Sequence, residues 1–148
     1  MSYTNILPNL WLGDYKISIC KEFFDVYKID IVINCTKDHG YYSNKTQNIR
    51  IEVDDSLRQH DIDKLYFYFD KTTDFINKNL NRGKNILVHC HAGKQRSANI
   101  VLAYLMKYGN MSYKNAKQYL KSKRPICFEP TNNFETAILK YEKDLNLT

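Results

Sequence analysis

The segment Val88 to Ser97, which reads VHCHAGKQRS, constrains this chain most, because it lies between an apolar strand pattern and an apolar helix pattern. A strand, a tight loop and a helix N-terminus together form an anion site, since the loop N–H groups can point inward and the helix dipole adds partial positive charge. Gly93 permits a backbone turn that a side chain would hinder. The segment therefore predicts a phosphate-binding loop.

Two side chains of this loop point to a reaction. Arg96 can offer its planar guanidinium to two phosphate oxygens as a bidentate pair, which lysine cannot do. Cys90 would lie among the N–H groups and beside Arg96, and this environment favours the thiolate over the thiol. Attack of a thiolate on phosphorus gives a phosphocysteine, which water then hydrolyses without any metal or other cofactor. We therefore predict an enzyme with Cys90 as the nucleophile and Arg96 as the phosphate clamp.

Three other interpretations of the loop fit less well. A nucleotide-binding loop requires an earlier glycine and Ser or Thr after its lysine, but Gly93-Lys94 is followed by Gln95. His89, Cys90 and His91 include adjacent strand residues that point to opposite faces, and no second ligand pair follows at zinc spacing, so we predict no metal site. A purely structural Cys90 would leave the spacing of the neighbouring loop residues as coincidence.

Length and composition favour one soluble domain. The chain has 148 residues and 43% hydrophobic content, which suffices for one core but not for two ordinary domains. It has no apolar run long enough for a membrane span and no signal-peptide pattern at Met1, and its four cysteines lack disulfide or metal spacing. We therefore expect an intracellular, cytoplasmic protein. The Asn-, Ile- and Lys-rich composition suits a large DNA virus or a protist, so a viral protein would act in the host cytoplasm or the virion.

The net charge of +6 has two interpretations. A positive field attracts anionic substrates, nucleic acid and acidic surfaces alike. The abundance of lysine is also typical of an A/T-rich genome. The charged residues of one Lys-rich helix are more often a solvated face than a nucleic-acid site: Lys114, Lys117, Lys121, Lys123 and Arg124. We therefore expect no nucleic-acid partner. The oligomeric state stays open, with a homodimer among the options.

Hydrophobic periodicity predicts an α/β fold. Residues 29–34 and 85–89 have the pattern of short buried strands, and residues 49–53 alternate like a third strand. Helical spacing covers four later segments, with Ser112 as a predicted N-cap: 63–80, 97–108, 112–121 and 132–145. The polar stretch 37–47 is expected to be a surface loop.

The His-Cys pair, five residues and then Arg-Ser resemble the signature of the cysteine-dependent protein tyrosine phosphatase superfamily. Segments 6–13, 29–34 and 123–125 and the terminal helix around Tyr141 further resemble its small dual-specificity branch. This resemblance implies a phosphatase-like α/β fold, with a central, mostly parallel sheet flanked by helices. Residues 1–148 would form one catalytic domain, with the active site at the carboxyl end of strand 86–89.

The resemblance also implies further catalytic residues. The general acid, which protonates the leaving oxygen and then activates water, would be Asp55, with Asp54 as the second choice and Asp61 as the third. The alternative is that these are solvated loop acids that cap the next helix. His89 would orient the loop and the thiolate, and Ser97 would hydrogen-bond the leaving thiolate in the second step.

The substrate-binding loop would consist of His91, Ala92, Gly93, Lys94, Gln95 and Arg96. A phosphoprotein substrate, with phosphotyrosine and phosphoserine or phosphothreonine, ranks first. A phosphoinositide ranks second, because Lys94 adds a cation but His91 is only partly charged near neutral pH. An RNA 5′-triphosphate ranks third, and a non-catalytic phospho-binding module is the alternative outside catalysis. Residues 130–134 depart from the Pro-Asn that the family often shows, so no asparagine there is assigned a role.

Overall fold

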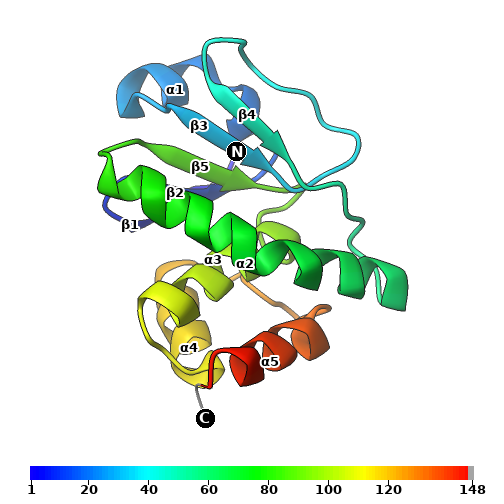
Figure 1. Ribbon diagram of the computed structural model, residues 1–148. Coiled ribbons are helices and arrows are strands. Elements are labelled where there is room, and N and C mark those ends of the chain that lie inside the picture. Colours follow the sequence, from blue (N-terminus) through cyan, green and yellow to red (C-terminus); the bar gives the residue numbers. More distant parts are fainter. Residues whose placement is uncertain (147–148) are drawn as a thin grey trace.

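The computed structural model describes residues 1–146 and contains a five-stranded sheet with helices on both faces (Figure 1). The elements in chain order are β1 (Tyr3–Leu7), β2 (Leu10–Gly13), the 3₁₀ helix η1 (Ile17–Ile19), α1 (Lys21–Tyr27), β3 (Ile31–Asn34), β4 (Gln47–Arg50), α2 (Gln59–Asn81), β5 (Ile86–His89), α3 (Arg96–Tyr108), α4 (Tyr113–Lys123) and α5 (Glu135–Asp144). Strands and helices are interspersed along the chain, as an α/β fold requires, although β1–β2 and β3–β4 follow one another without a helix between them.

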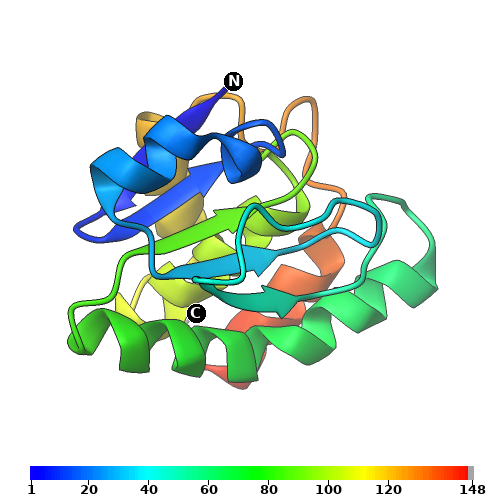
Figure 2. The same ribbon diagram turned by 90° about the horizontal axis from the view of Figure 1, so that it is seen from above.

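The sheet has the strand order β1-β2-β5-β3-β4. The neighbouring strands β2, β5, β3 and β4 are parallel to one another, and only β1 is antiparallel to its neighbour β2. Parallel strands end at one edge of a sheet, so the loops that follow β3, β4 and β5 gather at that edge (Figure 2). Ligands of open α/β sheets bind at this edge.

The three inner strands β2, β5 and β3 are buried on both faces, which explains their nearly continuous apolar sequence. In β3, Ile31 and Ile33 pack into the larger core under α2 to α5, whereas Val32 packs with the aromatic side chains of α1. In β5, Leu87 likewise faces the α1 side. This alternation with a period of two residues fixes the register of the sheet.

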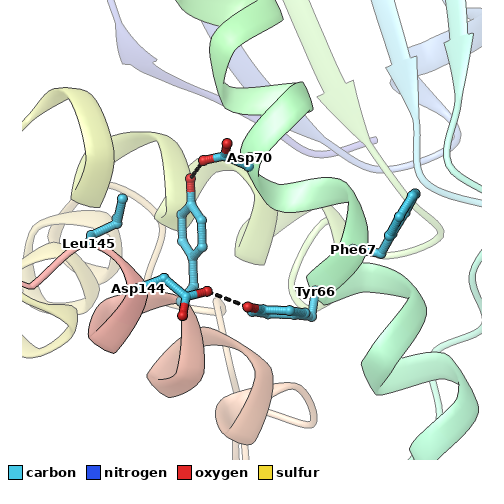
Figure 3. Close-up of a pocket in the computed structure, with 6 residues that line it drawn as sticks. Tyr66, Phe67, Asp70, Asp144 and Leu145 are labelled. Carbon is cyan, nitrogen blue, oxygen red and sulfur yellow. Dashed lines mark hydrogen bonds between the residues drawn. The ribbon is translucent and has the colours of Figure 1, made fainter.

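The helices below the sheet in Figure 1 surround α3, which is buried from Arg96 to Met106. Polar contacts connect α2 with its neighbours: the Tyr141 hydroxyl donates to Asp70 at 2.8 Å, and Lys107 Nζ lies 2.9 Å from the same carboxylate. A pocket of about 390 Å³ lies between α2 and α5 (Figure 3). Its lining is Tyr66, Phe67, Asp70, Tyr141, Asp144 and Leu145, so no residue of the predicted phosphate loop contributes to it.

The structure confirms the central strands and the N-cap at Ser112, whose hydroxyl accepts from the Asn115 N–H. Other boundaries were wrong. The predicted strand 49–53 is displaced to Gln47–Arg50, and α2 begins at Gln59. Helix α5 begins at Glu135, because Asn132 forms a polar contact with α3 instead of a first helical turn. No helix within residues 1–146 is long and apolar enough to cross a membrane.

Candidate active site

The loop after β5 has its carbonyl groups directed outward. The carbonyls of His91 and Lys94 accept from the Tyr15 and Phe128 N–H groups at 3.0 and 2.9 Å. Those of Ala92 and Gly93 accept from the Arg124 guanidinium at 3.2 and 2.8 Å. In a trans peptide the next N–H points the opposite way, so four successive N–H groups, of residues 92–95, face the interior of the loop. This arrangement is an anion-binding nest at the start of α3.

Arg124 supports this nest from outside, so its predicted place on a solvated helix face was wrong. Its side chain is buried, and besides the two loop carbonyls it donates to Thr4 Oγ1 at 3.1 Å. Gly93 has a φ of +68°, and a Cβ there would lie 2.5 Å from the Gly13 carbonyl oxygen. The loop therefore requires glycine at this position, both for its left-handed backbone and for this close approach.

Cys90 lies at the floor of the nest, immediately after β5, with 2% of its surface exposed. The Ser97 hydroxyl on the first turn of α3 donates to Cys90 Sγ at 3.0 Å. A hydroxyl donor next to sulfur stabilises the negative charge of a thiolate. The predicted nucleophile and its predicted partner are thus in direct contact.

Arg96 begins α3 and is 9% exposed. One Nη donates to the Val53 carbonyl at 3.0 Å, which connects the clamp to the loop that carries the acidic candidates. Its Nε is buried without a hydrogen-bond partner, and within residues 1–146 only His89 Nε2 shares this state. An unpaired buried donor is costly unless a ligand satisfies it, and a phosphate oxygen would do so.

His89 is buried at the end of β5, and its Nδ1 lies 3.2 Å from the Cys90 carbonyl. Because a carbonyl only accepts, Nδ1 carries a proton, and the low pKa of His89 leaves the imidazole neutral at pH 7. Burial lowers the pKa of His89 to about 4, opposed by this hydrogen bond and aided by the positive charges of His39, Arg50 and Arg96. The geometry fits the predicted role of orienting the Cys90 backbone rather than shuttling a proton.

The depressed pKa of His89 predicts a stability change at mildly acidic pH. The folded value of about 4 lies below the unfolded value of about 6.5, so the unfolded state binds more protons between them. Stability from neutral His89 is complete above about pH 6.5 and is lost as pH falls toward 4, by about 3 kcal/mol at most. The free energy of unfolding, measured with urea across this pH range, should therefore change less with pH in His89→Asn than in the wild type. The matched control His60→Asn, an exposed position on α2, should keep the wild-type slope.

The three candidate acids have different environments. Asp61 is fully buried and accepts from Ser56 Oγ at 2.6 Å and from the Asp54 N–H. Burial alone would raise the pKa of Asp61, but these hydrogen bonds outweigh burial, so its pKa lies below the usual value. Asp54 is paired with Lys37 at 3.1 Å and with Arg58 at 3.5 Å. Asp55 is exposed and accepts one hydrogen bond, from Asn133 Nδ2 at 2.8 Å. Arg58 also lies 3.5 Å from Asp61, so among the recorded ion pairs of residues 1–146 only Asp55 of the three candidates has no cationic partner.

Two of the predicted loop side chains have neighbours outside the nest. Gln95 is 3% exposed, and its amide bonds the segment before α5, so only its N–H is available for phosphate. His91 is exposed, and its Nδ1 lies 3.1 Å from His39 Nε2. Both imidazoles stack on the Tyr15 ring, with centroids 4.7 and 4.4 Å from it. The sequence had no signal for this three-ring wall, because its members come from three separate loops.

Comparison with known proteins gives a consistent picture. The family "Dual specificity phosphatase, catalytic domain" matches residues 10–144. The chain is 34% identical over 148 residues to protein 123R of Invertebrate iridescent virus 6, which is named as a tyrosine phosphatase. This match covers all of this chain and 97% of the viral protein. It is 37% identical over 146 residues to human dual specificity protein phosphatase 16, covering 96% of this chain.

The crystal structure of human DUSP28 superposes with a TM-score of 0.86 and 26% identity, covering 97% of this chain and 95% of that chain. Relatives differ in length, because the match to human dual specificity protein phosphatase 16 spans only 21% of that protein. The similarity therefore concerns the catalytic domain of such longer relatives.

Proposed function

Because this chain belongs to the dual specificity phosphatase family, we propose that it hydrolyses phosphotyrosine and phosphoserine or phosphothreonine in proteins through a phosphocysteine at Cys90. The observation that carries the proposal is the nest itself. It combines a sulfur that accepts a hydroxyl hydrogen bond, inward N–H groups and the unpaired Nε of Arg96. These groups match a phosphate dianion in charge and in hydrogen-bonding capacity.

The proposed reaction has two displacements at phosphorus. The N–H groups and Arg96 hold the nonbridging oxygens while Cys90 Sγ forms a bond to phosphorus and the ester oxygen leaves with a proton from Asp55. Asp55, now ionised, takes a proton from water, whose oxygen attacks phosphorus and breaks the S–P bond. The electron pair returns to sulfur, and Ser97 Oγ, 3.0 Å from it, stabilises the thiolate. Inorganic phosphate leaves and the enzyme is restored.

The similarity to dual specificity protein phosphatases supports a phosphoprotein before a phosphoinositide. Lys94 is the one lysine in the phosphate loop. A polyphosphorylated headgroup needs an excess of cations, whereas a single phosphomonoester needs only the nest and Arg96. We place this activity in the cytoplasm.

Replacing Asp55 by asparagine should lower kcat/KM about 100-fold for an aryl phosphate with a poor leaving group, because the step then lacks its proton donor. An activated, fluorinated aryl phosphate should be affected much less, since its leaving oxygen needs little protonation. Asp54→Asn is the matched control and should keep near wild-type turnover. If Asp54→Asn shows the larger loss, the acid is assigned to the wrong carboxylate.

Substrate choice is tested with wild-type enzyme in reducing, metal-free buffer. Phosphopeptides carrying phosphotyrosine or phosphothreonine, short-chain phosphoinositides and 5′-triphosphorylated RNA are compared by phosphate release. We expect the highest kcat/KM for the phosphopeptides. A higher value for either of the other substrates would replace the proposed substrate class while keeping the mechanism.

A further inference from the structure

The segment just before α5 contacts the proposed general acid from the far side of the site. Asn133 Nδ2 donates to Asp55 Oδ1 at 2.8 Å, although the two residues are 78 positions apart in sequence. The segment lies beside the phosphate loop at the carboxyl edge of the sheet (Figure 2). Asn133 is half-buried.

The backbone of Asn133 is fixed by the phosphate loop. The buried Gln95 side chain accepts from the Asn133 N–H at 3.0 Å and donates to the Thr131 carbonyl at 2.7 Å. The side chain of Gln95, the residue that precedes α3, thus binds backbone groups at two points of the segment that presents Asn133. Any displacement of the phosphate loop would therefore be transmitted to the acid.

A second polar frame holds the adjacent residue. Asn132 and Asn99 on α3 exchange two amide hydrogen bonds, each 2.9 Å long, and both side chains are buried. Asn132 Oδ1 also accepts from the Phe134 N–H at 2.9 Å. Fully paired buried amides define one arrangement of the segment, because any other would leave polar groups unsatisfied. Asn133 is consequently presented from a rigid support.

The contact has a chemical consequence for Asp55. An amide N–H donor orients the carboxyl group without adding a charge, and it occupies only Oδ1. Oδ2 remains available to carry the proton that the leaving oxygen needs. Asp54, by contrast, is paired with the cations Lys37 and Arg58, which favour its ionised form. The frame therefore distinguishes Asp55 from its neighbour.

We propose that Asn133 is a positioning residue that holds Asp55 in the orientation required for proton transfer, with Gln95 as its brace. The inference rests on the proposed phosphatase function, because it assigns Asn133 a role in that reaction. Two residues before Asp55, the Arg96 bond to the Val53 carbonyl anchors the same loop. The acid loop is thus attached directly to the start of α3 and, through Asn133, to the segment that Gln95 holds.

The test compares kcat/KM of Asn133→Ala and wild type on a poor and an activated aryl phosphate. We expect a loss of about tenfold with the poor leaving group and little change with the activated one, because only the former depends on Asp55. Asn133→Asp, which cannot donate and repels Asp55, should lose at least as much. Asn115→Ala, an exposed asparagine on α4, is the matched control.

A double variant separates positioning from general damage. If Asn133 acts through Asp55, then Asn133→Ala in an Asp55→Asn background should cause no further loss. An equal loss with both leaving groups, or a full additional loss in that background, would overturn the proposal. Thermal unfolding checks the fold, and Asn133→Ser replaces Asn133→Ala if the latter does not fold. Lack of turnover by folded wild type would instead refute the proposed function.

Discussion

Cys90→Ser should abolish turnover of phosphopeptides and aryl phosphates, with kcat at least about 10⁴-fold below wild type. A serine hydroxyl remains protonated in this site and is a far weaker nucleophile than a thiolate. The substitution is nearly isosteric at a residue that is 2% exposed, so the nest and its N–H groups should persist.

Phosphopeptide binding distinguishes lost chemistry from lost structure in this variant. Calorimetry should detect binding to Cys90→Ser without turnover, because the N–H groups and Arg96 still hold the phosphate. Cys20→Ser, at a half-buried cysteine before α1, is the matched control and should leave kcat unchanged. Substantial residual turnover by Cys90→Ser would contradict the assigned nucleophile.

Arg96→Lys should produce the second largest effect, with kcat/KM about 10³-fold lower. Lysine offers a point charge instead of the planar fork, so the bidentate contact with two phosphate oxygens is lost. It also lacks the second donor that reaches the Val53 carbonyl, so the loop that carries Asp55 loses an anchor. Arg82→Lys, an exposed position at the end of α2, should be indistinguishable from wild type. Near wild-type activity of Arg96→Lys would show that the charge alone suffices.

The parts of the fold that could be predicted are those with a regular hydrophobic period. Strands such as 86–89 are apolar on both faces, and α3 is apolar almost all round, so both patterns are visible locally. The β4 boundary was missed because Ile51 and Val53 are buried beyond the end of the ladder, in an extended segment that imitates a strand. The short N-terminal strands and α1 lack a period long enough to identify.

The site divides in the same way. Cys90, Arg96 and Ser97 lie within eight residues of one another, so the loop pattern placed Arg96 beside Cys90, and the family resemblance added the role of Ser97. Arg124, His39 and Asn133 reach the site from other parts of the chain, and their roles depend on tertiary packing. No local pattern marks such contacts, because the neighbouring sequence does not show whether an arginine will be buried or exposed in the folded protein.

The most direct test of the account is rapid acid quench of Ser97→Ala during turnover of an aryl phosphate, followed by mass spectrometry of the peptide that contains Cys90. Without the Ser97 hydroxyl the second displacement slows, so we predict a burst of the aryl alcohol close to one equivalent and a Cys90 peptide heavier by one phosphoryl group. A linear time course with no phosphoryl group on Cys90, or a phosphoryl group on another residue, would contradict the phosphocysteine mechanism.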